Sequence, residues 1–366
     1  MIKVKLKEIG SFKNGINFSA DRVSKGCKMI GIPNFGDRYF ADLSNLSEID
    51  KAIVPEECTL KDGDILFVRS NGNKALVGRT IIISEVSEMI TFSGFCIRFR
   101  PNNEIAIPLY LLLLFKSPIF RKRFSNTHQT SINNINQEVL GEIEVNLPSK
   151  EEQQKVIDCI SPIIRKIEIN NAVNDNLQQM AYDTYMHLFC GKKPNGKLGE
   201  IIIENAKSSV QVGEAKGVKS KFPFFTSGDT ILEWDCGLTN GRNCFFNTGG
   251  NAGVKFYVGE AAYSTDTWCI TANGELEDYL YLLLLSIMPE LSQKFFQGTG
   301  LKHLQKPLLK DRKIYIPTSR EIFDFNSKVK PWMNQISANS QENKYLSSLR
   351  DWLLPMLMNG QAVVED

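Results

Sequence analysis

The feature that most constrains this chain is an internal repeat: the sequence resembles itself when it is shifted by about 170 residues. Chance recurrence of apolar helices and Gly-Asn turns would explain any single match, but four matches occur in the same order. The repeat therefore predicts a duplicated unit. The matched segments are Ser70–Asn73 with Thr248–Asn251, Phe95–Ile97 with Trp268–Ile270, Tyr110–Leu114 with Tyr281–Leu285, and Ile143–Pro148 with Ile314–Pro317.

Each copy is predicted to be an α+β domain of about 150 residues or fewer, followed by a long helix. The turn signal at Lys61–Asp64 precedes a short apolar run that is typical of a buried strand. Further runs with the character of strands follow it in both copies, so strands lead each domain. The predicted strands cover residues 65–68, 77–83 and 94–100 in the first copy, and 253–258 and 267–271 in the second.

A long helix is predicted to begin after Pro148, because Ser149 and Glu152 have the spacing of a capping box. Apolar and asparagine residues then recur every seven positions, which is typical of a coiled-coil seam. Pro162 opposes this reading, because an interior proline kinks a helix or marks a later helix start. The seam positions are Val156, Ile160, Ile163, Ile167, Asn170, Asn174, Leu177, Ala181, Thr184 and Leu188.

A second seam with a polar centre follows at the carboxyl end of the chain. If the two helices pair antiparallel, Asn170 and Asn174 face Asn339 and Asn343, and these asparagines fix the register. A helix of about 36 residues spans roughly 54 Å, more than one turn of B-DNA at about 34 Å. Ordinary core helices with solvated asparagines are the alternative. The second seam comprises Ile322, Phe325, Val329, Trp332, Ile336, Asn339, Asn343, Leu346 and Leu353.

Composition indicates an ordinary folded protein of at least two domains, since the 366 residues are 42% hydrophobic and 23% charged. The net charge of +2 requires no nucleic-acid partner by itself. The eight cysteines form no Cys-x-x-Cys pair and the three histidines lie far apart, so neither zinc nor a disulfide framework is expected. The apolar runs are too short to cross a membrane, and a reducing cytoplasm is the expected location.

The chain resembles the specificity subunits of type I restriction-modification systems over nearly its whole length. No single motif is as specific as a set of metal ligands, but their order together with the repeat supports the assignment. The second helix departs from the pattern, because it lacks the Glu-Glu-Gln of the first. The stretches that carry the resemblance are Gly63–Arg69, Gln129–Asn136, Leu147–Pro148, Glu151–Gln153, Gly298–Leu304, Ile316–Pro317 and Leu353–Gly360.

This resemblance implies two repeated α/β target recognition domains, separated by two long helices that form an antiparallel coiled coil. We expect target recognition domains at residues 1–148 and 191–317, and conserved helices at 149–190 and 318–366. Double-stranded DNA, methyltransferase subunits and a restriction (motor) subunit are the implied partners. S-adenosylmethionine, ATP and Mg²⁺ would be bound by those partner subunits, and no cofactor by this chain.

Catalytic motifs are missing from the sequence. Adenine methyltransferases flip the base into a pocket that typically uses Asn or Asp followed by Pro-Pro, and the chain contains no Pro-Pro. Gly249–Gly253 does not fit the dinucleotide-binding pattern. Gly191–Leu198 resembles a phosphate-binding loop, but Leu198 replaces the hydroxyl residue and the segment follows a helix. We therefore expect no catalytic residue.

Residues that read DNA are expected in anchored polar loops, since Arg pairs well with guanine and Asn or Gln with adenine. Basic residues after an apolar helix can bind phosphates. Solvated loops and a solvated basic face remain the alternatives. The predicted DNA-binding residues are Arg69, Ser70, Asn71, Asn73, Lys74, Arg121, Lys122, Arg123, Gln129, Thr130, Asn133 and Asn134 in the first domain, and Thr226, Ser227, Asn247, Thr248, Asn251, Lys302 and His303 in the second.

The sequence alone leaves two other classes of function open. A self-sufficient DNA methyltransferase or nuclease would transfer methyl groups or cleave DNA without partners. A coiled-coil scaffold would hold two protein-binding domains and would not contact DNA.

Overall fold

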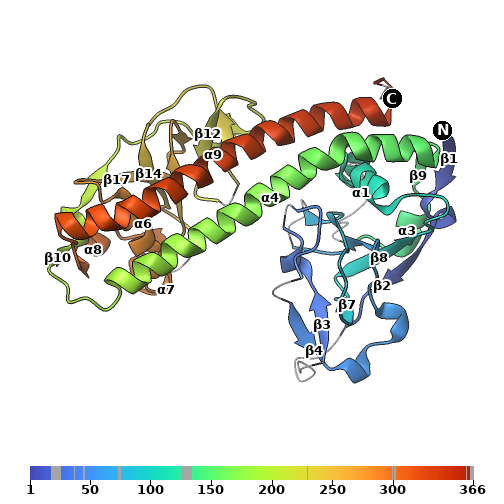
Figure 1. Ribbon diagram of the computed structural model, residues 1–366, viewed down its shortest axis with the longest axis horizontal. Helices are drawn as coiled ribbons and strands as arrows, with labels where there is room; N and C mark the ends of the chain where they lie inside the picture. Colours follow the sequence, from blue (N-terminus) through green and yellow to red (C-terminus); the bar gives the residue numbers. More distant parts are fainter. Residues whose placement is uncertain are drawn as a thin grey trace. The chain divides into compact units, whose positions relative to one another are not determined.

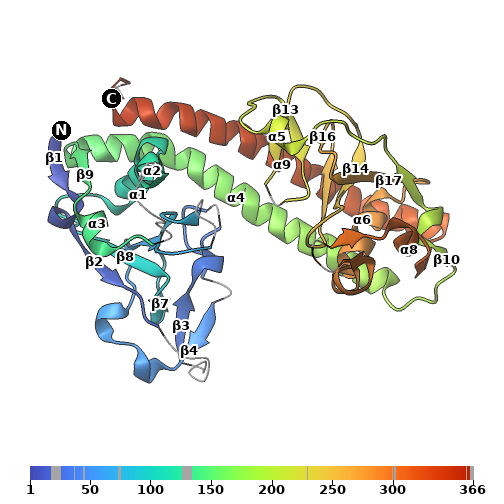
Figure 2. The ribbon, with the colours of Figure 1, turned by 180° about the vertical axis from the view of Figure 1, so that it is seen from behind.

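The computed structural model describes residues 1–17, 26–36, 38–43, 46–72, 76–125, 134–228, 230–298, 300, 302–359 and 361–362. The chain divides into two compact units, Met1–Glu168 with Lys344–Asp366, and Ile169–Asn343. Each unit contains an α+β domain and part of each of two long helices (Figures 1 and 2).

Three sheets build the domain of the first unit. A four-stranded sheet has the order β2-β8-β5-β6, a three-stranded sheet has the order β4-β3-β7, and β1 pairs with β9. The strands are β1 (Ile2–Lys5), β2 (Gly10–Asn14), β3 (Cys27–Ile30), β4 (Ser47–Ile49), β5 (Ile65–Val68), β6 (Thr80–Ile82), β7 (Ile90–Phe92), β8 (Cys96–Pro101) and β9 (Glu144–Leu147). The helices are α1 (Pro108–Lys116), α2 (Pro118–Ser125) and α3 (Gln137–Gly141).

The second domain repeats this arrangement, with sheets β11-β17-β14-β15, β13-β12-β16 and β10-β20, and a further pair β18-β19. Its strands are β10 (Gly196–Lys197), β11 (Ile202–Glu204), β12 (Phe222–Phe225), β13 (Leu232–Trp234), β14 (Arg242–Asn247), β15 (Val254–Val258), β16 (Ala262–Tyr263), β17 (Thr267–Ala272), β18 (Phe296–Gln297), β19 (His303–Leu304) and β20 (Lys313–Ile314). The short helices are α5 (Val212–Ala215), α6 (Glu277–Ser286), α7 (Met288–Glu290) and α8 (Lys306–Lys310).

Strand order and strand direction both confirm the duplication. In each three-stranded sheet one pair is parallel, β3 with β7 and β12 with β16, and the other pair is antiparallel. Val68 pairs with Cys96 in the first domain, and Phe245 pairs with Cys269 in the second. The cysteines that the sequence repeat aligned therefore occupy corresponding strand positions.

Both long helices begin at a capping box. In α4 (Lys150–Phe189), the Ser149 amide donates to Glu152 Oε2 at 2.9 Å and the Glu152 amide donates to Ser149 Oγ at 3.3 Å. In α9 (Ser319–Met358), Thr318 and Glu321 exchange the same two bonds at 2.8 and 3.4 Å. The first box confirms the predicted helix start, and the second supplies a start signal where Glu-Glu-Gln is missing.

Helix α4 continues through Pro162, so the expectation of a later helix start is wrong. Pro331 lies 169 residues further on, inside α9, and both prolines are exposed. An exposed proline removes one backbone donor on the solvent side, where water satisfies the carbonyl that loses its partner. The duplication therefore includes the position of Pro162 and Pro331, whereas Pro355 of α9 has no counterpart in α4.

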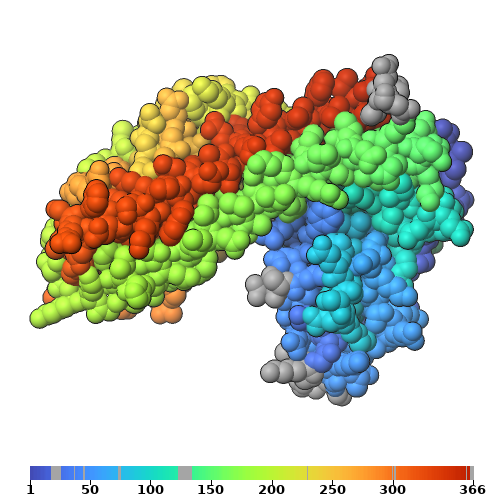
Figure 3. Space-filling view, viewed as in Figure 1, coloured from blue at the N-terminus to red at the C-terminus, as the bar shows by residue number. Residues whose placement is uncertain are grey.

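The two helices are antiparallel. In the first unit, Val156, Ile160 and Ile164 of α4 share a core with Leu354 and Leu357 near the end of α9. In the second unit, the end of α4 shares a core with the beginning of α9, as an antiparallel pair requires. The two segments lie side by side in Figure 3. Those residues are Ala181, Tyr185 and Phe189 with Ile322, Phe325, Val329 and Met333.

Each domain is hydrogen-bonded to a long helix, at two helix positions that lie 169 residues apart in the sequence. The Tyr39 amide donates to Glu168 Oε1 of α4 at 3.1 Å within the first unit. The Val258 amide donates to Ser337 Oγ of α9 at 3.0 Å within the second. Among the described residues, no helix is both long and apolar enough to cross a bilayer.

Candidate nucleic-acid interface

Two loops of the second domain form what we call the second platform, residues Thr248–Gly250 together with Lys302–Leu304. Gly249 and His303 form an antiparallel bridge. The Gly250 amide donates to the Lys302 carbonyl at 2.9 Å, and the Leu304 amide donates to the Thr248 carbonyl at 3.0 Å. Backbone bonds of this kind hold polar side chains in a fixed arrangement.

A third loop joins the second platform through Ser227. The Thr248 amide donates to Ser227 Oγ at 3.3 Å, and both hydroxyl groups donate to the Asp266 carbonyl, Thr248 Oγ1 at 2.7 Å. The sequence did not single out Asp266, because its contribution is a backbone oxygen. Three separate chain segments therefore meet at one place.

Two of the predicted residues support this platform from within. Thr226 and Asn247 are buried. Asn247 Nδ2 donates to the Asn251 carbonyl at 3.1 Å, and Lys255 Nζ donates to the Thr226 carbonyl at 3.0 Å. The side chains of Lys302 and His303 in the second platform, and of Asn251 directly after it, are exposed, so a ligand can reach them.

The first domain has the same two-loop arrangement, which we call the first platform: Arg69, Ser70, Asn134 and Ile135. Ser70 and Asn134 form an antiparallel bridge, and the Ile135 amide donates to the Arg69 carbonyl at 2.9 Å. Each platform thus joins the loop after an inner strand, β5 or β14, to the segment just before a short helix, α3 or α8.

The remaining predicted residues of the first domain lie outside the first platform or outside the described residues. Asn71 directly follows Ser70 of the first platform. Arg121 and Lys122 lie in α2, where Arg121 Nη1 donates to the Val77 carbonyl at 3.2 Å. Arg123 also lies in α2, but its side chain is not described. Asn73, Lys74, Gln129, Thr130 and Asn133 lie outside the described residues.

Sequence reasoning missed Phe95, whose side chain is 58% exposed beside the first platform. The repeat aligns Phe95 with Trp268, and both lie within predicted strands, at residues 94–100 and 267–271. Trp268 is only 4% exposed, and its Nε1 donates to Glu204 Oε2 at 2.6 Å. The Ser93-Gly94 turn before Phe95 was the available signal, since a turn can expose an apolar residue that a strand would bury.

Two lysines cover Trp268. Lys306 Nζ lies 4.7 Å and Lys310 Nζ 5.8 Å from the ring centroid. Partial burial lowers the pKa of Lys306, while a hydrogen bond from Lys310 lowers the pKa of Glu204. Both lysines pair with the Glu204 carboxylate, so this cluster supplies no unpaired group for catalysis.

Five asparagines link the helices within the second unit, and one of their bonds runs from Asn343 Nδ2 to Asn171 Oδ1 at 2.8 Å. Asn170 Nδ2 donates to Asn343 Oδ1 at 2.9 Å, and Asn339 Nδ2 donates to Asn174 Oδ1 at 2.8 Å. Asn170 also donates to Glu342 Oε2 at 2.8 Å. Asn170 and Asn174 lie 169 residues before Asn339 and Asn343, so the Asn170–Asn343 and Asn339–Asn174 bonds join equivalent positions of the repeat.

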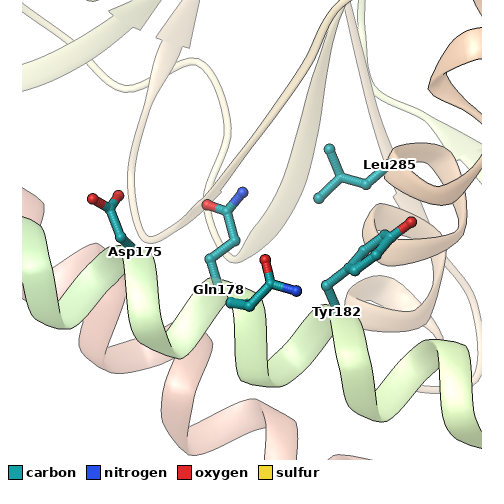
Figure 4. A pocket seen from close by; sticks show the side chains of 5 residues that line it. Asp175, Gln178, Tyr182 and Leu285 are labelled. Atoms are coloured by element: carbon teal, nitrogen blue, oxygen red, sulfur yellow. The ribbon is translucent and has the colours of Figure 1, made fainter. Parts of the chain in front are cut away.

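A hollow on the second unit is lined by Asp175, Gln178, Gln179 and Tyr182 of α4 and by Leu285 of α6 (Figure 4). Its lining comprises one carboxylate, two amides, a phenol and an apolar side chain. That set contains no pairing of a nucleophile with a general base. In the described part of the chain, no group of three or more His, Cys, Asp or Glu side chains is arranged to hold a metal.

Comparison with known proteins gives a consistent result. Residues 1–179 and 192–343 match the family described as "Type I restriction modification DNA specificity domain". The chain is 28% identical to the HindI specificity subunit of Haemophilus influenzae, over 82% of this chain and 87% of the relative. It is 23% identical to the MjaIX specificity subunit of Methanocaldococcus jannaschii, over 87% and 82%.

A solved structure shares the fold. The S subunit of a type I restriction-modification system from M. genitalium superposes with a TM-score of 0.58 at 14% sequence identity. The superposition covers 97% of this chain and 95% of that one. The fold is therefore retained although few residues are identical.

Proposed function

The chain belongs to the type I restriction-modification DNA specificity family, and from this premise we propose that it selects the DNA target of a multi-subunit complex without catalysing a reaction itself. The observation that carries the proposal is the duplicated platform. Two domains of the same topology each hold polar side chains on two loops joined by a β-bridge. Such a pair is suited to reading two short DNA sequences.

Each platform would read one half of a bipartite target. Arg69 and Asn134 in the first domain and Asn251, Lys302 and His303 in the second offer donors and acceptors for base edges or phosphates. Backbone bonds to neighbouring segments keep these loops in place, so little conformational freedom is lost on binding. We extend the same role to Asn73, Lys74, Gln129, Thr130 and Asn133 from their sequence positions.

The helices would set the spacing between the halves. The two symmetric Asn–Asn bonds disfavour a slip of one helix along the other, because a shifted register would leave amide groups unpaired between the helices. We therefore propose that α4 and α9 together act as a ruler between residues 1–148 and 191–317.

The partners would be methyltransferase subunits and a restriction subunit, which would bind S-adenosylmethionine, ATP and Mg²⁺. Exposed apolar residues on the helices are suited to docking, since such side chains mark protein interfaces. In the second unit, Ile169, Val173 and Met180 form a stripe along α4. In the first unit, Tyr345 and Trp352 lie one heptad apart on α9, and 70% and 62% of their surfaces are exposed.

The test combines the purified chain with its methyltransferase subunits, labelled S-adenosylmethionine and a library of random DNA. We expect methylation only when both proteins are present, and only at sites that share two short sequences at a fixed separation. Methyl transfer by the chain alone would establish a self-sufficient enzyme. Methylation without sequence selection would leave the scaffold as the correct description.

A further inference from the structure

A rigid turn presents Phe95 to solvent. The Gly94 amide donates to the Ile16 carbonyl at 2.8 Å, and the Phe95 amide donates to Ser93 Oγ at 3.1 Å. A Cβ added at Gly94 would lie 1.9 Å from Asn17 Oδ1, so the turn is closely packed on its inner side. An aromatic ring held this way loses little entropy when a partner covers it.

Arg69 of the first platform lies next to Phe95. The Arg69 amide donates to the Phe95 carbonyl at 2.8 Å, directly beyond the Val68–Cys96 pair of β5 and β8. Arg69 Nη1 donates to the Gly94 carbonyl at 3.4 Å, and the buried Nε has no partner among the described residues. The surface therefore combines an open apolar ring with a half-buried guanidinium group beside it.

The second domain offers no equivalent ring, because Lys306 and Lys310 cover Trp268 and Glu204 accepts from its indole. The ring is covered in one domain and open in the other, although the sequence repeat aligns Phe95 with Trp268. This difference beside otherwise similar platforms would let the two domains read different half-targets.

We propose that Phe95 makes an apolar contact with the methyl group of a thymine in the half-target read by the first domain, next to bases or phosphates bound by Arg69. The proposal rests on the proposed function. Thymine is the base whose major-groove edge carries a methyl group, and apolar side chains are its usual partners. Phe95 is then a specificity-determining residue of the first domain.

The experiment uses the chain assembled with its methyltransferase subunits and DNA that carries the methylated target. Each thymine of the first half-target is replaced in turn by deoxyuridine, which lacks only the methyl group. At one position the wild-type complex should bind about fourfold more weakly, the value for one buried methyl group. Phe95→Ala should bind the original target about tenfold more weakly and should not distinguish thymine from deoxyuridine there.

Ile2→Ala is the matched control, because Ile2 is another exposed apolar residue of the first unit, on β1. It should leave both the affinity and the deoxyuridine effect unchanged. Equal deoxyuridine effects in the wild type and Phe95→Ala would overturn the inference, as would a first half-target without thymine or a loss of subunit assembly in Phe95→Ala. A wild-type complex that selects no sequence would overturn the proposed function as well.

Discussion

Asn170 donates a hydrogen bond from Nδ2 to Oδ1 of Asn343, 2.9 Å away, and only 3% of the Asn170 surface is exposed. The same amide reaches Glu342. Replacing Asn170 with leucine removes this donor from both acceptors, of which Glu342 is exposed and Asn343 is half-buried between the helices. The free energy of unfolding should fall by about 1–3 kcal/mol.

Urea denaturation of the whole chain measures this change. Asn176→Leu is the matched control, since Asn176 is exposed on the same helix, and its effect should stay within about 0.5 kcal/mol. An Asn170→Leu protein as stable as Asn176→Leu would show that the asparagines do not hold the helices in register.

The capping box of α9 predicts a pH dependence of stability. Hydrogen bonds from Lys192 and from Thr318 lower the pKa of Glu321 from its ordinary value of 4.5 to about 2. Because the folded pKa is depressed, the stabilisation is fully present above the unfolded pKa and is lost as the pH falls toward 2. The advantage of the wild type over Glu321→Gln should therefore be constant at neutral pH and shrink below about pH 5.

Chemical denaturation of both proteins at several pH values gives that difference directly. Substitution of an exposed carboxylate elsewhere on α9, Asp324→Asn, is the control. A difference between wild type and Glu321→Gln that is independent of pH would contradict the assigned role of the Glu321 carboxylate.

The second platform predicts how two lysines differ in their effect on DNA binding. Lys302 is exposed beside His303, whereas Lys255 donates to the Thr226 carbonyl beneath the platform. Lys302→Ala should weaken binding of the assembled complex to all sequences and reduce the slope of log affinity against log salt by about 1. Lys255→Met should instead lower the unfolding temperature.

Affinity titrations at several salt concentrations, with thermal unfolding of the same variants, distinguish the two roles. An unchanged salt slope in Lys302→Ala would remove this residue from the DNA-binding surface.

Sequence reasoning predicted most of the fold because the duplication repeats the signals of each element. The strand at residues 65–68 and the helix start at Ser149 are confirmed. The predicted strand at 77–83 is shorter than expected and covers Thr80–Ile82, since Gly78 has a φ of +73° and ends a turn. The Thr318–Glu321 box carries no Glu-Glu-Gln, so the motif that marks the first helix gives no signal at the start of the second.

The sites were harder to predict, because one of two similar side chains can be buried as a support while the other is exposed to a ligand. Asn247 and Asn251 both fit a polar recognition loop, yet Asn247 is buried and donates to the Asn251 carbonyl. Phe95 and Trp268 align as apolar residues, yet one is open and the other is covered by lysines. These differences arise from tertiary packing, which the order of residues along the chain does not reveal.

Mapping methylated adenines in the host genome tests whether the chain selects a two-part target, with the wild-type chain, without the chain, and with His303→Ala combined with Lys302→Ala. We expect a two-part motif that vanishes without the chain, and that changes only in the half read by the second domain in the double variant. A motif that survives removal of the chain, or that consists of one continuous sequence, would contradict this expectation.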